Sequence, residues 1–318
     1  MDSIMSSFHV FAYSFGDLNL TSASVTAPRV GLCARDATLT DSVVNTTGRG
    51  CVSEMGLGGA KGSAVCSGTG GAHGGQGGAG SAYSDHPLST TICKPQNPPL
   101  YDNISTAQFE GSGGASGVKN GKLGGSGGGI IWLLTTDDMT LQGSQLISRG
   151  ADGKLHHRNQ EIGSGGGSGG TIKLIAEKYR GDGALDVSGG VGSVSGGSGS
   201  GGFLSVQPIF PSADSAVTFS EWTGTVNIQG GGQTSNTSTS GGEGLVTQNM
   251  CGEGKSGPFC QKCPVGTFKP DFSDMACQPC FNKPKNSFYS ESGISVPFCP
   301  YVCDVSLPAV DENPKCLT

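Results

Sequence analysis

The segment GSGGGSGGTIKLIA, residues 163–176, passes from glycine and serine directly into an alternating apolar run. In that run Ile172 and Leu174 point to one side and Lys173 to the other, which predicts a β-strand with one inward face. The same arrangement occurs twice more, in GGSGGGIIWLL (124–134) and GGSGSGGFLSV (196–206). The chain therefore repeats one glycine-rich unit.

When Ile131, Ile172 and Leu204 are aligned as equivalent positions, the spacings are 41 and 32 residues, so the repeat is irregular. Alternating runs also precede residue 50, and a second short strand is expected after each repeat, in 144–150, 184–190 and 225–232. Turning the chain between strands on every coil requires positive φ angles and close backbone approach, and glycine tolerates both.

We therefore predict an all-β fold in which residues 1–248 form a glycine-rich parallel β-solenoid, with a loop-rich part over 50–125. Each coil of a solenoid buries its few apolar side chains against its neighbours. A disordered linker is the alternative, but a linker has no need for strands after each glycine tract.

Composition excludes several classes of protein. The 57 glycines among 318 residues greatly exceed ordinary usage, but no Gly-X-Y period exists, so the chain is not a collagen. The net charge of −6, with arginines that are widely spread, argues against a nucleic-acid partner.

Twelve cysteines and four glycosylation sequons indicate the secretory pathway. Two even-numbered groups of cysteines predict disulfide pairing within each group. The first group is Cys33, Cys51, Cys66 and Cys93. The second is Cys251, Cys260, Cys263, Cys277, Cys280, Cys299, Cys303 and Cys316. The sequons lie at Asn19, Asn45, Asn103 and Asn236. Disulfides persist outside the cytosol, so we expect an extracellular or cell-surface chain.

The first residues do not form a signal peptide, since they lack a basic start and a sustained apolar core. No apolar run approaches the roughly 18 residues of a membrane span. We therefore expect this chain to be a fragment of a longer protein.

Residues 249–318 contain too few apolar side chains for an ordinary core, which predicts a small module stabilised by disulfides. The spacing of eight cysteines cannot choose among their 105 pairings. Four of them resemble the thiolate set of a zinc ribbon, namely Cys260, Cys263, Cys277 and Cys280. An intracellular zinc-binding protein is thus one alternative, although it leaves four cysteines without a role.

The stretch CQKCPVGTFKPDFSDMACQPC (260–280) resembles the ephrin-receptor-like cysteine-rich module. In such modules Gly266 would form a turn and Phe268 would pack on a disulfide. GGAHGGQGG (70–78), the glycine–strand repeats and PFCPYVCD (297–304) extend the likeness to the glycine-rich, ephrin-receptor-like membrane proteins of plants and protists. This resemblance implies an ectodomain without catalytic residues, which would join a membrane only through a further C-terminal part.

A catalytic interpretation is the other alternative, because parallel β-helices often carry polysaccharide hydrolases and lyases. Asp137 and Asp138 follow a strand and His157 lies about one coil later, so stacking could bring carboxylates beside an imidazole for acid–base work. Lys173 could then bind an acidic sugar. We favour the simpler interpretation, in which LLTTDDMTLQG is a solvated turn.

No metal or cofactor is expected, because the glycine tracts lack the aspartates of calcium-binding repeats. His73 has no neighbouring ligand type and is expected to be a loop residue. The favoured function is a non-enzymatic structural, adhesive or receptor-like segment. Its partner would be an extracellular protein or a glycan.

Overall fold

The computed structural model describes residues 9–62, 66–81, 100–102, 107–117, 123–155, 163–209, 221–233, 238–247, 249 and 251–304. Regular structure in these residues consists of β-strands. Within the same residues, no helix is long and apolar enough to cross a membrane. The chain divides into two compact units, Met1–Ile209 with Thr223–Thr247, and Phe210–Trp222 with Gln248–Thr318.

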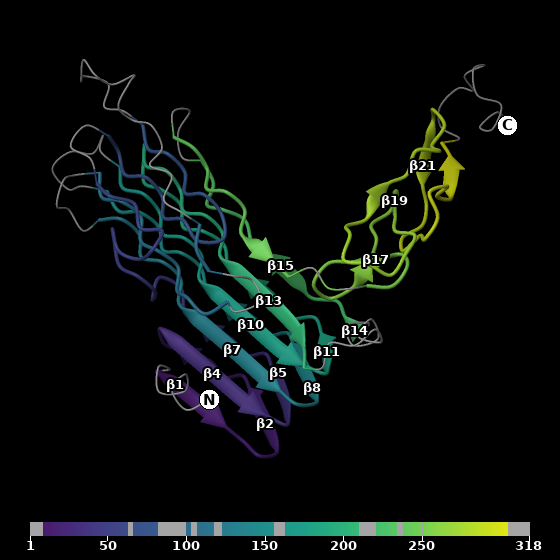
Figure 1. The fold of residues 1–318 in the computed structure, drawn as a ribbon, viewed down its shortest axis with the longest axis horizontal. Helices are drawn as coiled ribbons and strands as arrows, with labels where there is room; N and C mark the ends of the chain where they lie inside the picture. Colours follow the sequence, from purple (N-terminus) through teal and green to yellow (C-terminus); the bar gives the residue numbers. More distant parts are fainter. Residues whose placement is uncertain are drawn as a thin grey trace. The chain divides into compact units, whose positions relative to one another are not determined.

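The first unit is a β-solenoid in which successive coils stack their strands into three parallel sheets (Figure 1). The first sheet has the order β1 (Val10–Tyr13), β4 (Arg29–Ala34), β7 (Ile130–Thr135), β10 (Thr171–Ala176), β13 (Phe203–Pro208) and β16 (Leu245–Val246). Within this unit the second sheet holds β2 (Asp17–Thr21), β5 (Asp36–Thr40), β8 (Asp138–Gln142) and β11 (Lys178–Gly181). The third sheet holds β3 (Ser24–Thr26), β6 (Val43–Asn45), β9 (Gln145–Ile147), β12 (Ala184–Asp186) and β15 (Thr225–Asn227).

The register of the first sheet confirms the alignment made from the sequence. Ile172 is paired with Ile131 on one side and with Leu204 on the other. Val30 of β4 continues the same row, because it pairs with Ile131. All four side chains are 0% exposed, so this row is a central ladder of the core.

The middle strands β2 and β5 fall in the alternating runs expected before residue 50, but the later middle strands were not expected from the sequence. Residues Asp138–Gln142 form β8, with Met139 and Leu141 buried, so the expectation of a solvated turn is wrong for this segment. Its outward residues are polar, and two adjacent aspartates precede its apolar pair. That composition conceals the alternation of a strand.

Side-chain caps end the third strand of several coils. The Oδ1 atoms of Asn45, Asp186 and Asn227 each accept a hydrogen bond from the backbone N–H two residues later, at 2.8, 2.9 and 3.2 Å. Short Asn and Asp side chains make this local turn readily. The chain then leaves the sheets and enters a glycine tract.

The glycine tracts are not loops but a bundle of extended segments joined by backbone hydrogen bonds. Between β12 and β13, the N–H groups of successive residues in 197–202 donate to three neighbouring tracts in rotation. Gly197 donates to the Gly68 carbonyl, and Ser200 donates to Gly71 of the same tract. Ser198 and Gly201 donate to a second tract, at Thr239 and Gly242. Gly199 and Gly202 donate to a third, at Gly190 and Val187. Since residues i and i+3 face the same neighbour, the backbone repeats every three residues, as in a polyproline-II-like conformation.

The tract 163–170 follows the same rule. Its N–H groups donate to the carbonyls of Ala115 and Ser112, of Gly197 and Ser200, and of Ala151 and Ser148, in pairs three residues apart. Figure 1 shows these tracts as long ribbons that extend beyond the strand arrows. The backbone groups of the tracts are thus satisfied by one another, as buried peptide groups require.

Glycine is needed in these tracts for close approach and not for turning. The glycines within tracts 163–170 and 196–202 have no φ in the left-handed region. A Cβ on Gly199 would instead lie 1.9 Å from the carbonyl oxygen of Gly167. The prediction of close backbone approach is confirmed, and the prediction of positive φ angles is wrong for these tracts. Positive φ occurs at corners such as Gly143, between β8 and β9, where it is 59°.

The second unit contains short strands and little core. Three antiparallel pairs are formed by β17 (Lys255–Ser256) with β18 (Gln261–Lys262), β19 (Thr267–Phe268) with β20 (Gln278–Pro279), and β21 (Ser287–Tyr289) with β22 (Tyr301–Cys303). Disulfides join Cys251 to Cys260, Cys263 to Cys277, and Cys280 to Cys299.

Two features complete this unit. In β14 (Glu221–Trp222), Trp222 stacks on the buried Phe259 with ring centroids 4.4 Å apart. Gly266 adopts a φ of 83° in the turn that Thr267 closes by donating to the Pro264 carbonyl, and Phe268 is buried. Cys303 is also disulfide-bonded, and Cys316 lies outside the described residues.

Candidate functional site

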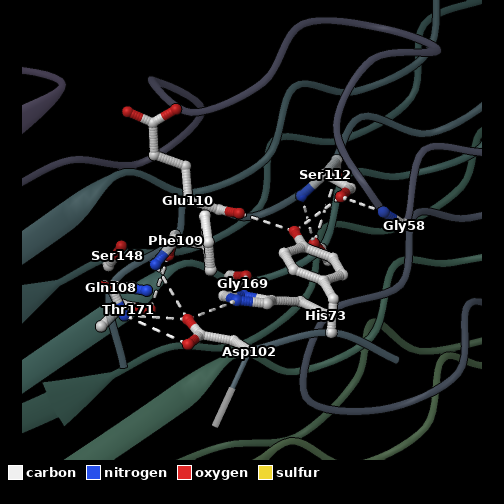
Figure 2. A network of polar contacts seen from close by, with 12 residues as sticks. Gly58, His73, Asp102, Gln108, Phe109, Glu110, Ser112, Ser148, Gly169 and Thr171 are labelled. Atoms are coloured by element: carbon white, nitrogen blue, oxygen red, sulfur yellow. Dashed lines mark hydrogen bonds and ion pairs between the residues drawn. The ribbon is translucent and has the colours of Figure 1, made fainter. Parts of the chain in front are cut away.

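A buried polar network surrounds His73, whose side chain is 0% exposed (Figure 2). A carbonyl oxygen only accepts, so the contact of 2.8 Å between the His73 Nδ1 atom and the Gly169 oxygen requires Nδ1 to carry the proton. The ring stacks on Tyr101 at 4.6 Å and meets the edge of Phe203 at 4.8 Å. His73 lies in a bend outside the strands, as expected of a loop residue, but its side chain is packed in the core of the glycine bundle.

Asp102 faces the other side of this imidazole. Its Oδ2 atom lies 3.6 Å from His73 Nε2, and both side chains are fully buried. The same carboxylate accepts backbone hydrogen bonds from Gln108, at 3.0 Å, and Phe109, at 2.9 Å. Two peptide donors therefore hold this carboxylate in place beside the imidazole, away from solvent.

Tyr101 extends the network toward the tract at residues 107–117. Its hydroxyl donates to the Glu110 carbonyl at 2.6 Å and therefore accepts from the Ser112 hydroxyl, also at 2.6 Å. The Ser112 oxygen in turn accepts from the Gly58 N–H at 3.0 Å. Burial raises the pKa of Tyr101 far above its ordinary value, so this phenol stays neutral and serves as a donor.

This network connects segments rather than exposing a reactive group. His73 and Asp102 do not meet solvent, so neither can act on a substrate from outside. Asp102 contacts His73, and His73 in turn is hydrogen-bonded to Gly169, so three separate segments of the chain are connected. A second tie comes from Thr171, whose hydroxyl donates to the Phe109 carbonyl at 2.8 Å. The network is therefore a structural staple of the solenoid.

A cavity of about 890 Å³ lies elsewhere in the first unit, at the edge of the glycine bundle. Its floor includes Gly124 and Gly125, and its apolar wall is formed by Val52 and Met55, which are 61% and 56% exposed. This volume lies within the range of about 300–1,000 Å³ that is typical of ligand sites.

Charged side chains of both signs complete the lining of this cavity: Glu54, Lys61, Asp152 and Lys154. Three of them are anchored to nearby backbone. Glu54 accepts from the Ser116 N–H at 3.2 Å, Lys61 donates to the Glu54 carbonyl at 3.0 Å, and Asp152 accepts from the Val191 N–H at 2.8 Å. An apolar wall beside oriented polar groups suits a polar ligand with an apolar face, such as a sugar.

Of the catalytic alternative, the structure describes the two aspartates, and each of them lies near an arginine. Asp138 forms an ion pair with Arg180 at 2.6 Å, and Asp137 lies 3.9 Å from Arg35 at the corner between β7 and β8. His157 lies outside the described residues. Lys173, which was considered for an acidic sugar, lies on the first sheet with its Nζ atom 5.3 Å from the centre of the Trp132 ring.

The zinc alternative is wrong. Its four cysteines, Cys260, Cys263, Cys277 and Cys280, belong to three different disulfides, so none of them offers a thiolate to a metal. Within the described part of the chain, no group of three or more His, Cys, Asp or Glu side chains is arranged to hold a metal ion.

The prediction that all cysteines pair must also be corrected. Cys33 and Cys51 are free thiols, whereas Cys66 is disulfide-bonded. Cys33 lies on β4, where it pairs with Tyr13 and Leu134 of the neighbouring strands. The backbone of Cys51 is hydrogen-bonded to the glycine tracts, so the two thiols lie on different elements of the fold. Burial raises the pKa of both thiols. Cys93 lies outside the described residues.

Two of the four sequons fall on described strands. Asn19 is exposed on β2, where a glycan could be attached. Asn45 is half-buried, because its side chain caps β6 by accepting from Thr47. Asn103 and Asn236 lie outside the described residues.

Comparison with known proteins adds one finding. A family model described as a domain of unknown function (DUF8003) matches residues 246–314, which is the cysteine-rich part of the chain. No curated protein and no solved structure shows significant similarity to the chain.

Proposed function

We propose that this chain is a non-enzymatic extracellular or cell-surface segment with a structural, adhesive or receptor-like role. The observation that carries the proposal is the disulfide pattern of the second unit, where consecutive bonds hold together a chain with few buried apolar residues. Such modules depend on an oxidising compartment for their stability.

The first unit supports the same role. Its backbone bundle and stacked sheets form a scaffold, and solenoids present extended surfaces to partners. Asp137 and Asp138, the strongest catalytic candidates, are each placed beside an arginine. We propose that the cavity bounded by Val52, Met55 and Lys154 receives part of an extracellular glycan or protein ligand.

The compartment is tested by intact mass of the chain after secretion from a eukaryotic host. Among the cysteines that the structure describes, alkylation without reductant is expected to label Cys33 and Cys51 alone, slowly, since their raised pKa values lower the thiolate fraction at neutral pH. A glycan is expected at the exposed Asn19. Alkylation of Cys263 or Cys277 without reductant would refute the disulfide-dependent, extracellular assignment.

The role of the cavity is tested on a glycan array with two charge-reversal variants. Lys154→Glu changes the lining of the cavity and is expected to reduce binding to any glycan that the wild-type chain retains. Lys178→Glu makes the same change on the exposed edge of β11 and is expected to leave binding unchanged. Equal binding by both variants would exclude the cavity as the ligand site.

A further inference from the structure

Two phenylalanine rings of the second unit stand together in solvent. Phe281 and Phe298 are 70% and 66% exposed, and their ring centroids are 5.5 Å apart in an edge-to-face arrangement. Single apolar side chains are ordinary on a protein surface, but contiguous apolar patches mark interaction sites.

The exposed pair is held in place by covalent and polar bonds. Each ring belongs to a residue that adjoins one half of the Cys280–Cys299 disulfide. The side chain of Asn282 adds two hydrogen bonds to Cys299, donating to its carbonyl at 2.8 Å and accepting from its N–H at 3.0 Å. These bonds hold the backbone segments that carry the two rings next to each other.

The two segments that carry these rings continue into a hairpin with a further apolar pair. Phe288 on β21 lies directly opposite Val302 on β22, and the two side chains are 53% and 43% exposed. Between Phe281 and Phe288 the chain carries exposed Lys283 and Lys285. Aromatic side chains interspersed with lysines are the composition of surfaces that enter the interface of a phospholipid bilayer.

The size of the aromatic surface favours a bilayer over a second copy of the chain. With the exposed fractions given above, the paired Phe281 and Phe298 offer roughly 270 Å² of surface. A stable protein interface buries about 800 Å² on each partner, so this patch alone is too small for a lasting dimer. Insertion of a few ring edges into lipid has no such minimum area.

We propose that Phe281 and Phe298, with Lys283 beside them, form a membrane-contact patch. The rings would enter the boundary between headgroups and acyl chains, and the ammonium group would lie near lipid phosphates. The inference goes beyond the proposed function and does not depend on the cavity or on a glycan. If the chain is secreted and disulfide-bonded but does not bind vesicles, the membrane-contact patch is refuted and the proposed extracellular role is unaffected.

The test is co-sedimentation of the full chain with vesicles of phosphatidylcholine, with and without phosphatidylglycerol. The double variant Phe281→Ser/Phe298→Ser is expected to lower the partition coefficient at least about tenfold. Its matched control is Val265→Ser/Met275→Ser, which removes apolar side chains that are 52% and 51% exposed in the same unit, and it is expected to bind as wild type.

Charge is tested separately on the vesicles that contain phosphatidylglycerol. Lys283→Glu is expected to weaken binding to them at least about fivefold, and more than it weakens binding to phosphatidylcholine alone. Lys262→Glu, at an exposed lysine of β18, is the control and is expected to change binding little.

Folding of each variant is checked by its disulfide content in the intact mass. If the serine variants do not fold, Phe281→Trp gives a second measurement, because an inserted indole is quenched by brominated lipid. Three results would overturn the proposal: wild-type chain that stays in the supernatant, an unquenched indole, or vesicle binding that survives loss of both rings. A concentration-dependent dimer that the double variant abolishes, without vesicle binding, would assign the patch to a second copy instead.

Discussion

Replacing Gly199 by alanine tests whether neighbouring glycine tracts pack so closely, backbone against backbone, that no Cβ atom fits between them. The N–H of Gly199 donates to the Gly190 carbonyl at 2.9 Å, and its own carbonyl accepts from Gly231 at 2.8 Å. A Cβ at this position would lie 1.9 Å from the carbonyl oxygen and 2.3 Å from the carbonyl carbon of Gly167. Both contacts are with backbone, so no side chain can rotate away to relieve them.

The cost follows from the displacement that this methyl group requires. Real Cβ atoms essentially never approach other heavy atoms within 3.0 Å, so the two tracts must separate by at least 1.1 Å, the difference between 3.0 and 1.9. Gly167 is bonded on both sides, to Ala151 at 2.9 Å and to Gly190 at 2.8 Å. A shift of that size lengthens such bonds beyond hydrogen-bonding distance. Two lost buried bonds with unsatisfied groups predict a destabilisation of about 3 kcal/mol.

The control is Gly232→Ala, in the neighbouring tract. A Cβ there meets nothing within 4 Å, and the φ of Gly232 is not in the left-handed region. This change is expected to be neutral or to stabilise the fold by about 0.4–1 kcal/mol, because it restricts the unfolded chain. The assay is urea unfolding followed by circular dichroism, with hydrogen exchange of tract peptides to locate the effect. If Gly199→Ala unfolded within about 0.5 kcal/mol of Gly232→Ala, close backbone packing would not be the reason for glycine.

Three further outcomes are expected. Asp102→Ala should destabilise the first unit by about 3 kcal/mol, since it leaves two peptide donors without their carboxylate, and an unchanged urea midpoint would contradict this. Cys263→Ser opens a disulfide with a sequence separation of 14 and should cost the second unit about 3 kcal/mol, with its partner thiol newly open to alkylation. Burial raises the pKa of Tyr101 and Tyr179, so stability present below the ordinary tyrosine value of about 10 should fall as pH rises beyond it. An absorbance titration should show these two phenols ionising only on unfolding, and their ionisation in the folded chain would refute the assignment.

The strand ladder could be predicted because its cause is local. Ile131, Ile172 and Leu204 each stand second in an apolar run after a glycine tract, and parallel stacking puts equivalent positions side by side. The middle strands β2 and β5 could be expected from alternating runs before residue 50, but β8 and β11 could not be found in this way. In β8 the apolar residues Met139 and Leu141 are separated by threonine and preceded by two aspartates, which reads equally well as a turn.

The staple around His73 could not be predicted for a different reason. Its members come from positions 73, 102 and 169, and only the path of the tracts brings them together. No spacing rule connects them, since the intervening segments differ in length and form no regular repeat. The one signal in the sequence was a histidine within a glycine tract. Closely packed backbone leaves little space for a large ring, so such a residue indicates a specific packing site.

Serine explains why the tracts are not pure glycine. A Cβ fits only where it points away from the neighbouring backbone, and there a hydroxyl can replace a backbone partner. Ser168 accepts from the Ser112 N–H at 2.8 Å, and Ser200 accepts from the His73 N–H at 3.0 Å. Ser148 donates to the Gly129 carbonyl at 2.8 Å, at the point where a tract leaves the third sheet. In these tracts glycine marks positions that face another backbone at contact distance, and serine marks positions where a side chain completes the hydrogen bonding. The mixture of glycine and serine in these tracts resembles a low-complexity sequence, but it follows from the packing and hydrogen bonding of a protein interior.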